Sequence, residues 1–288
     1  RPVHGLINGE YFGLFNLRER ANEHFLSAKT KLPPDGIDMV DGLLSPIHGN
    51  SKAIKNAFDW LRNQDPHEPD FFDQLIGHFD IDQFIDYLAI QIYAANKDWP
   101  HNNVTLWRPS GPDGRIRWML NDLDMSMGWH RGEYDDSTFS RLLSRVETAP
   151  SSMLGLCLKN QKFKEHFAKR FLFRLENDLS PAKVISLIDD VSLHVRDEMP
   201  PHIKRWGGSN LAGLTVPETM DAWDTQVQAL RNYAFHRNAY LRKHLSAWLS
   251  LEEPVLMQVL KEGDGGGSLE IDGMAMEFDE KGVWESHV

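Results

Sequence analysis

The chain has 288 residues, of which 41% are hydrophobic and 25% charged, as expected for a soluble globular protein of one two-lobed domain or two modest ones. Asp and Glu number 42 against 31 Lys and Arg, and the formal charge of -11 argues against a nucleic-acid-binding face, which normally needs a basic patch. The single cysteine excludes an intrachain disulfide and a cysteine zinc site, and no apolar run approaches the roughly 18 residues of a membrane span.

The first residues predict a β-hairpin. Residues 3–7 and 11–15 have strand-like composition, and Asn8-Gly9 between them is a strong two-residue turn signal. Gly9 and Gly13 could form a lid over nucleotide phosphates, although such turns are common without that role. The chain begins at Arg1 rather than at Met and enters in mid-strand, so a leader or further sequence of a truncated first lobe stays an open alternative.

The region before residue 80 is predicted to combine short helices with loop. One helix is expected over residues 18–26, with Glu19 near its start, and another over residues 50–63, whose apolar side chains recur on one face. Residues 30–49 are rich in Pro and Gly and predict an irregular loop at the lobe boundary.

The clearest helical pattern begins at Asp80 and continues to Tyr93, with apolar residues at three- and four-residue spacing. This helix should present Asn96 and Asp98 from a rigid, buried element, and Pro100 should end it. Two strands are then expected over residues 104–108 and 115–120, joined by a loop dense in turn residues.

The second half of the chain is predicted to be mainly helical. Helices are expected over residues 139–146, 153–158, 163–175, 181–195 and 222–248, with an interruption at Pro200-Pro201. From residue 251 a strand over 255–260, a flexible connector over 263–268 and short strands around Asp272-Gly273 resemble the start of a separate β module.

The expected fold class is therefore α+β. A small β-hairpin N-lobe would occupy about residues 1–79, and a mainly helical C-lobe about residues 80–250 would contain the hairpin that carries the candidate site. A β-rich extension would begin at residue 251.

Asp98, Asn103 and Asp122 follow the order of the catalytic-loop Asp, the metal-binding Asn and the metal-binding Asp of protein kinases. Such enzymes need one carboxylate to orient a hydroxyl, and an amide and a second carboxylate to hold Mg²⁺ on the nucleotide phosphates. The chain departs from the usual motifs, because Asn96-Lys97 replaces His-Arg and Leu123-Asp124 replaces Phe-Gly. The five-residue spacing is common by chance, but its place between a buried helix and a strand pair that ends in acids favours a phosphoryl-transfer site.

Asp122 and Asp124 are a candidate metal pair. If the chain is still extended there, their side chains point to the same side, where two negative charges are costly without a cation. The alternative, a solvated acid pair at the start of a loop, is equally compatible with the spacing. Asn102, Asn103 and Asn121 are oxygen donors of the kind that Mg²⁺ accepts.

Other chemically active residue types are expected to have structural roles. The 13 histidines, His101 and His130 near the site among them, have no zinc-motif spacing. The nine tryptophans, including Trp99, Trp107, Trp118 and Trp129, could form a carbohydrate platform, but their neighbours favour packing. Cys157 stands in an apolar run and is expected to be buried.

At these residues the sequence resembles the spore coat protein H (CotH) kinase family of atypical secreted or coat-associated protein kinases. The similarity covers roughly residues 3–248 and is carried by residues 8–19, 81–87, 96–103 and 118–128, with weaker matches between residues 160 and 170, at 204–206 and at 233–241. The tail from Leu251 also resembles the β extension that follows such domains in larger surface proteins.

The resemblance implies an atypical protein-kinase-like fold that transfers the γ-phosphate of ATP, with Mg²⁺, to Ser or Thr of a protein substrate outside the cell or at the cell or spore surface. Asp98 would orient the acceptor hydroxyl, Asn103 and Asp122 would bind metal, and Asp124 is the second acid. The residues implied to bind nucleotide are Gly9, Gly13, Glu19 and Asn103. The phosphate-pairing lysine stays unassigned among Lys29, Lys31, Arg18, Arg20 and a position upstream of Arg1.

Two other functions stay open. The unassigned lysine and the β tail would also suit a catalytically silent CotH-like module for surface or coat assembly. Metal-dependent hydrolysis of a phosphoester at the same acids is the third hypothesis. The acceptor protein, the nucleotide preference and the oligomeric state do not follow from the sequence.

Overall fold

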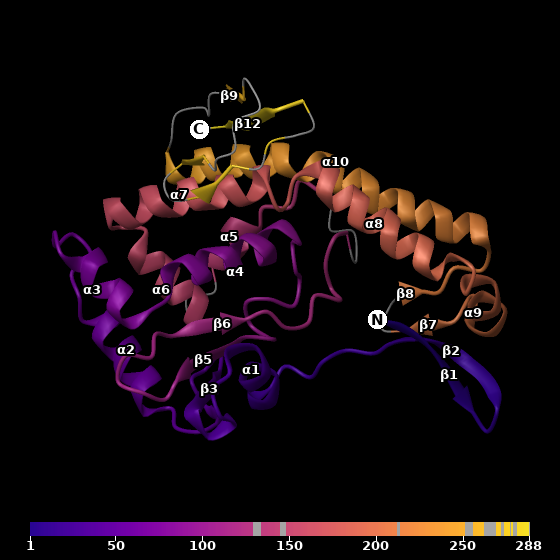
Figure 1. The fold of residues 1–288 in the computed structure, drawn as a ribbon, viewed down its shortest axis with the longest axis horizontal. Coiled ribbons are helices and arrows are strands. Elements are labelled where there is room, and N and C mark those ends of the chain that lie inside the picture. Colours follow the sequence, from indigo (N-terminus) through magenta and orange to yellow (C-terminus); the bar gives the residue numbers. More distant parts are fainter. Residues whose placement is uncertain are drawn as a thin grey trace.

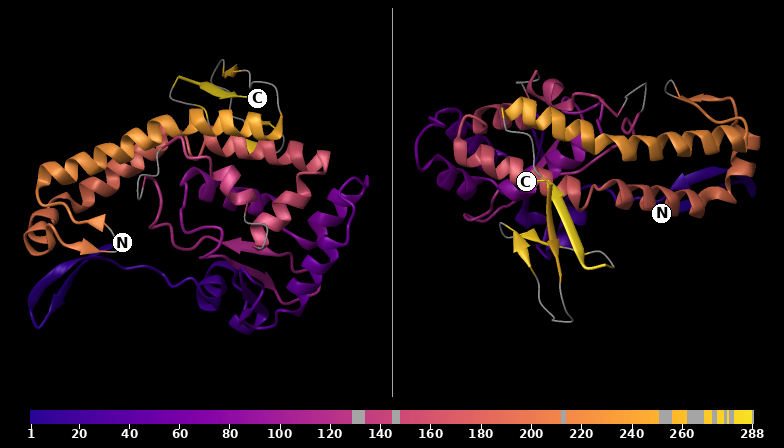
Figure 2. Two further views of the ribbon diagram at one scale, coloured as in Figure 1. Left: turned by 180° about the vertical axis from the view of Figure 1, so that it is seen from behind. Right: turned by 90° about the horizontal axis from the view of Figure 1, so that it is seen from above.

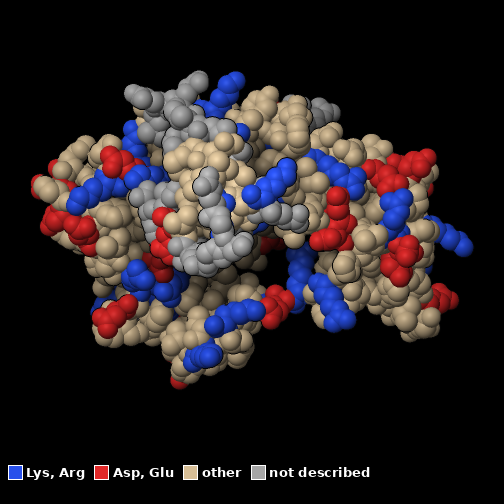
Figure 3. Space-filling model, turned by 45° about the horizontal axis from the view of Figure 1, so that its top comes forward, with Lys and Arg blue, Asp and Glu red and all other residues tan. Residues whose placement is uncertain are grey.

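A computed structural model describes residues 1–128, 134–144, 148–211, 214–250, 256–261, 269–271, 274–276, 278 and 281–287. These residues form an α+β fold, as predicted, in which helices accompany small antiparallel sheets. Figure 1 shows an elongated molecule in which the long helix α10 (Met220–Leu249) runs along most of the length, from the end near α9 to above α7. On the face drawn in Figure 3, Lys and Arg are interspersed with Asp and Glu.

The largest sheet has four antiparallel strands in the order β4 (Pro46–His48), β3 (Ile37–Asp41), β5 (Thr105–Pro109) and β6 (Arg117–Met119). The β5–β6 pair confirms the predicted strands. The prediction of an irregular loop over residues 30–49 is wrong, because this segment contains a short 3-10 helix (Pro34–Gly36), β3 and β4. Ile37, Met39 and Val40 are buried, and their packing on both sides of the sheet stabilises a strand that turn-forming residues flank.

Helices cover both faces of this sheet. On one face, α1 (Glu23–Thr30) packs through Leu26 against Ile37 and Met39. On the other, helices α2 (Lys52–Arg62), α3 (Phe71–His78), α4 (Ile81–Tyr93) and α7 (Gln161–Glu176) share one continuous core with the sheet. Because β3 pairs with β5 and the core continues through α2, α3 and α4, the sheet and the core both cross the predicted lobe boundary near residue 79.

The helix predicted over residues 18–26 begins later in the structure. Asn22 is the N-cap of α1, and its Oδ1 accepts the N–H of Phe25 at 3.1 Å. Because this cap fixes the helix start at Glu23, residues 17–21 form a link without helix between the N-terminal hairpin and α1.

The helical pattern predicted after residue 128 is confirmed in the described residues by α5 (Thr138–Leu143), α6 (Ala149–Cys157), α7, α8 (Pro181–Arg196) and α10. The interruption expected at Pro200-Pro201 occurs just before them, because α8 ends at Arg196 and the next helix begins at Met199, but the two prolines themselves do not break a helix. They lie in the first turn of α9 (Met199–Trp206), where a missing N–H removes no helical hydrogen bond.

The predicted N-terminal hairpin is present, formed by β1 (Pro2–Ile7) and β2 (Glu10–Asn16), and its turn has positive φ at Asn8 and Gly9. It is separate from the four-stranded sheet and lies against α9, near the small pair β7 (Asn210–Leu211) and β8 (Leu214–Thr215) (Figures 1 and 2). The indole N–H of Trp206 donates to the Phe12 carbonyl at 2.6 Å, and His202 Nδ1 accepts the Leu14 N–H at 3.1 Å. Side chains of α9 therefore bind backbone groups of β2.

The contact between His202 and β2 is expected to weaken in acid. Burial lowers the pKa of His202 below its ordinary value of 6.5, and Nδ1 can accept a hydrogen bond only while the ring is neutral. The stability that this contact contributes is therefore complete above pH 6.5 and is lost as the pH falls through the lowered folded-state pKa. In the same region, His4 Nε2 of β1 lies 2.7 Å from a carboxylate oxygen of Glu198.

This prediction can be tested with the variant His202→Asn, whose amide oxygen accepts a hydrogen bond at either pH. Between about pH 7.5 and about pH 5, the melting temperature of the wild type should fall further than that of the variant. An equal fall in both proteins would show that His202 is not the titrating contact.

The tail from residue 251 forms strands, as predicted. Strand β9 (Leu256–Leu260) pairs with β12 (Val283–His287), which contacts α7, and β10 (Glu270–Ile271) pairs with β11 (Met274–Ala275). The predicted connector over residues 263–268 and Asp272-Gly273 lie outside the described residues. Within the described ranges, no helix combines the length and apolarity that a bilayer crossing requires.

Candidate functional site

The Asp98 loop, residues 94–103, leaves the C-terminal end of α4. The Asp98 carboxylate accepts the side-chain amide of Asn102 at 2.6 Å on Oδ1 and that of Asn103 at 2.9 Å on Oδ2. Asn103 has a positive φ of 57°, which Asn tolerates better than most residues. His101 Nε2 lies 3.6 Å from Asp98 Oδ1. The structure thus places Asp98 and Asn103 in direct contact.

Asn96 joins the Asp98 loop to the segment after β6. This side chain is fully buried; its Oδ1 accepts the Asp98 N–H at 3.1 Å, and its Nδ2 donates to the Asp122 carbonyl at 3.1 Å. A second link runs from the Lys97 N–H to the Met125 carbonyl at 2.9 Å. The sequence pattern did not indicate this role for Asn96, although a polar residue directly after a buried helix is a signal for it.

Asp122 and Asp124 lie close together, but not on one side of an extended strand as expected. The chain is not extended here, because β6 ends at Met119 and Asp122 has a positive φ of 47°. Burial raises the pKa of Asp124, and the negative charges of Asp122 and then Asp98 raise it further. The Asp124 carboxylate therefore lies close enough to those of Asp122 and Asp98 to be repelled by both.

This acidic group fits a divalent cation only if other oxygen donors complete the site. Among the described residues, no three or more His, Cys, Asp or Glu side chains are arranged to hold a metal ion. Mg²⁺, however, is usually bound by one or two carboxylates together with substrate phosphates and waters. Asp122, Asp124 and the amide oxygen of Asn103 are a donor set of that kind.

The basic side chains of Lys97 and Arg141 form ion pairs with Asp136. Its carboxylate is ion-paired with Lys97 and with Arg141, whose Nη1 lies 3.1 Å from Oδ1, and Thr138 donates to the same oxygen at 2.9 Å. The Lys97 and Arg141 charges, together with the Thr138 hydrogen bond, overcome burial and hold the pKa of Asp136 below its usual range. The pairing of Asp136 with Lys97 and Arg141 was not identified from the sequence, because no local pattern marks Asp136 as their partner.

The predicted nucleotide-binding residues Gly9, Gly13 and Glu19 lie on the hairpin and the link that follows it. Gly9 occupies the turn, and a side chain at Gly13 would approach the Trp206 indole nitrogen to 3.0 Å, so Gly13 permits the packing on α9. Glu19 Oε2 lies 3.6 Å from Lys29 Nζ. Among the described residues, no hydrogen bond or ion pair joins Gly9, Gly13 or Glu19 to Asp98, and their nucleotide role stays a prediction.

The remaining expectations concern packing. Trp99, Trp107 and Trp118 are buried, which confirms the packing interpretation for them. Cys157 is buried as expected, and burial raises the pKa of its thiol. Trp129 and His130 lie outside the described residues.

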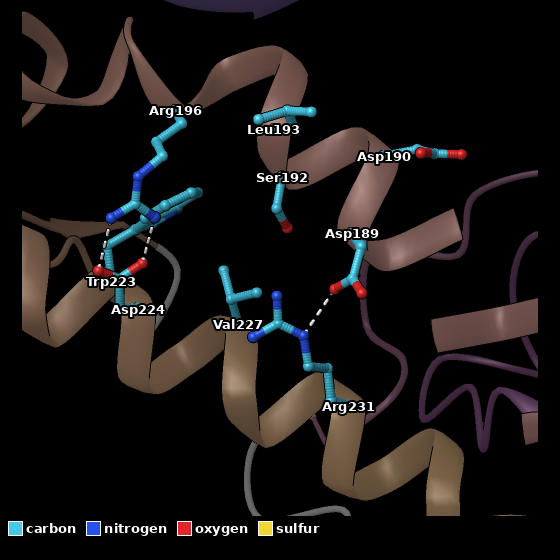
Figure 4. Close-up of a pocket in the computed structure, with 9 residues that line it drawn as sticks. All are labelled: Asp189, Asp190, Ser192, Leu193, Arg196, Trp223, Asp224, Val227 and Arg231. Atoms are coloured by element: carbon cyan, nitrogen blue, oxygen red, sulfur yellow. Dashed lines mark hydrogen bonds and ion pairs between the residues drawn. The ribbon is translucent and has the colours of Figure 1, made fainter. Parts of the chain in front are cut away.

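Two open cavities lie elsewhere. One, of about 280 Å³, lies between α8 and α10 (Figure 4), where Arg196 pairs with Asp224 and Arg231 with Asp189. The other, of about 330 Å³, is lined by residues that include Asp38, Asn50, Lys52 and Arg108. In the described part of the chain, neither cavity is lined by Asp98, Asn103, Asp122 or Asp124.

The family model described as CotH kinase protein matches residues 47–241, well over half of the chain. The chain belongs to the CotH kinase family. The matched region contains Asp98, Asn103, Asp122 and Asp124 and begins after the N-terminal hairpin, so the CotH match does not extend to Gly9, Gly13 or Glu19. A comparison with proteins of curated function finds no match.

Proposed function

We propose that this member of the CotH family is an atypical protein kinase that transfers the γ-phosphate of ATP to a Ser or Thr hydroxyl of a protein. The observation that carries the proposal is the contact of Asp98 with Asn103 beside the Asp122–Asp124 pair. One buried amide, Asn96, ties the two segments together. A kinase requires this combination of an orienting carboxylate and an amide–carboxylate metal site.

Asp98 is the residue suited to orient the acceptor hydroxyl. Two amide donors and a backbone hydrogen bond to Asn96 fix its position, so that little reorganisation is needed when a hydroxyl approaches. Because phosphoryl transfer depends mainly on positioning and on electrostatic stabilisation, such rigidity contributes directly to rate.

Asn103, Asp122 and Asp124 are the residues that would hold Mg²⁺, which when bound neutralises charge on the nucleotide phosphates. The raised pKa of Asp124 supports this assignment, because it reflects carboxylates that repel one another. The basic residues beside them, Lys97 and Arg141, are paired with Asp136. A divalent cation would relieve the repulsion.

Lys29 is the candidate that we favour for the phosphate-pairing lysine. Its ammonium lies 3.6 Å from the Glu19 carboxylate, and kinases hold the corresponding lysine with a glutamate. Both side chains are exposed, so the pair itself contributes little stability and is free to engage a ligand.

Phosphate transfer by the whole chain tests the proposal. Incubation with Mg²⁺ and radiolabelled ATP should label the protein itself or a casein-like acceptor, and mass spectrometry should place the phosphate on Ser or Thr. We expect Asp122→Asn to reduce transfer by about 100-fold or more, because a charge that stabilises the reacting phosphates is lost. The matched variant Asp113→Asn, in the exposed β5–β6 loop, should retain the wild-type rate.

Other outcomes would identify another function. Release of free phosphate without labelled protein would indicate phosphoester hydrolysis. A catalytically silent binding module is the alternative that the distance of the hairpin from the four-stranded sheet favours. A thermal-shift titration with Mg-ATP distinguishes this alternative. The unfolding free energy of a nucleotide binder rises by about 2.7 kcal/mol at a ligand concentration 100 times Kd, which raises its melting temperature, whereas the melting temperature of a protein that does not bind Mg-ATP stays unchanged.

A further inference from the structure

Asp136 lies between the Asp122–Asp124 segment and α5 in the chain, and its carboxylate pairs with Lys97 of the Asp98 loop and with Arg141 of α5. Its side chain is 18% exposed, and those of its partners Lys97 and Arg141 are 27% and 23% exposed. Its backbone carbonyl also accepts a hydrogen bond from Arg237 Nη1 at 2.8 Å. Asp136 is thus a partly buried carboxylate with two cationic partners and a fixed backbone.

Both cationic partners belong to, or directly hold, the Asp98 loop. Lys97 precedes Asp98 in the chain, and its own N–H donates to the Met125 carbonyl at 2.9 Å. Arg141 Nη2 donates to the Asn96 carbonyl at 2.9 Å. Through these contacts, the charge of Asp136 holds the backbone that directly precedes Asp98 and, through the Asn96 side chain, the backbone at Asp122.

Regulated kinases order their activation loop, the segment after the metal-binding Asp, by phosphorylation, because a phosphate creates new ion pairs with basic side chains. In this chain the Asp136 carboxylate already pairs with two basic side chains, Lys97 and Arg141, without a phosphate. Breaking the arrangement would leave Lys97 and Arg141 partly buried without their anion, which opposes rearrangement of the segment.

We propose that Asp136 is a positioning residue that holds the Asp98 loop and the Asp122–Asp124 segment in their working arrangement by a permanent negative charge, so that no phosphorylation of residues 123–144 is needed. The inference rests on the proposed function for its kinetic consequence. Its structural consequence, an ordered site that depends on the Asp136 charge, is independent of any activity.

The structural arm of the test is hydrogen exchange measured by mass spectrometry on the protein without nucleotide. In Asp136→Asn, amides of residues 95–103 and 122–128 should exchange about tenfold faster or more, while those of α7 keep the wild-type rate. Asp136→Glu should restore much of the protection. The adjacent Asp135→Asn, at an exposed position, should exchange as the wild type does. Wild-type exchange in Asp136→Asn would overturn the proposal.

The kinetic arm uses the same variants. We expect kcat for phosphate transfer to fall about 10- to 100-fold in Asp136→Asn with a much smaller change in KM for Mg-ATP, because misplacement of the orienting carboxylate affects the reacting geometry. Lys97→Gln should lower kcat in the same way and serves as the second variant if Asp136→Asn does not fold. If the wild type transfers no phosphate, the proposed function fails, and the exchange data alone decide the role of Asp136.

Phosphatase treatment of the wild-type protein tests the proposal without any substitution. The treated protein should keep its rate of phosphate transfer and its protection of residues 95–103. Loss of either, together with a phosphorylated residue mapped between 123 and 144 before treatment, would overturn the proposal, because order would then depend on phosphate.

Discussion

Replacing Asp98 by Asn is expected to reduce phosphate transfer by about 10²- to 10⁴-fold, the range observed when a positioned acid–base group is lost. The amide keeps the shape of the side chain but removes the negative charge that would orient the acceptor hydroxyl. Its contacts with Asn102 and Asn103 at 2.6 and 2.9 Å would have to rearrange, because an amide nitrogen cannot accept a hydrogen bond. The measurement is initial-rate transfer of labelled phosphate under saturating Mg-ATP.

Two controls separate this chemical effect from loss of structure. The melting temperature of Asp98→Asn should stay within a few degrees of the wild type, and its thermal shift with Mg-ATP should persist, because Asp98 is not among the proposed metal ligands. Transfer within tenfold of the wild-type rate would contradict the role of Asp98, and loss of the thermal shift would instead assign it to nucleotide or metal binding.

Replacing Arg237 by Met is expected to cost roughly 3–5 kcal/mol of unfolding free energy, among the largest effects of any single substitution in the chain. This arginine of α10 is fully buried. It donates to the Ile92 and Tyr93 carbonyls at the end of α4 at 2.7 and 2.9 Å, and to the Tyr134 and Asp136 carbonyls at 2.8 Å each. Because each hydrogen bond from a charged donor contributes about 1.5–3 kcal/mol, the loss accumulates over several contacts. The Ile92, Tyr93 and Asp136 carbonyls each keep one other donor, from the Ala95 N–H, the Tyr233 hydroxyl and the Thr138 N–H.

Chemical denaturation of the variant measures this loss, and a matched substitution on the same helix provides the comparison. Arg231→Met removes a half-exposed surface pair with Asp189, which is worth at most about 1 kcal/mol. Arg237→Lys should recover little, because an ammonium cannot reproduce the planar fork of the guanidinium. An unfolding free energy of Arg237→Met within about 1 kcal/mol of the wild type would show that water or rearrangement satisfies the acceptors.

Much of the local structure could be predicted from the sequence. Helix α4 has apolar residues at helical spacing, the turn residues of 109–114 mark the β5–β6 hairpin, and Asn8-Gly9 marks the first turn. Each of these signals comes from residues that are neighbours in the chain. The order of Asp98, Asn103 and Asp122 is likewise a property of the sequence, as is the resemblance to the CotH family that the match over residues 47–241 confirms.

Other features depend on partners far away in the chain. Strand β3 is stabilised by pairing with β5, about 70 residues later, as the hydrogen bond between Asp38 and Arg108 also shows. The hairpin β1–β2 has a recognisable turn, but its place against α9 is decided by Trp206 and His202, almost 200 residues further on. Local patterns contain no information about these distances.

The sequence by itself determined the α+β class, the main helices and the identity of the acidic and amide residues from which a kinase site could be built. Only the tertiary structure decided that Asn96 joins the two segments of the site, that Asp136 holds Lys97 and Arg141, and that Arg237 fixes the end of α4. The physical reason is that a buried polar side chain must find partners where packing brings carbonyls and charges within reach. That meeting depends on the whole fold and not on the neighbours of the residue in the chain.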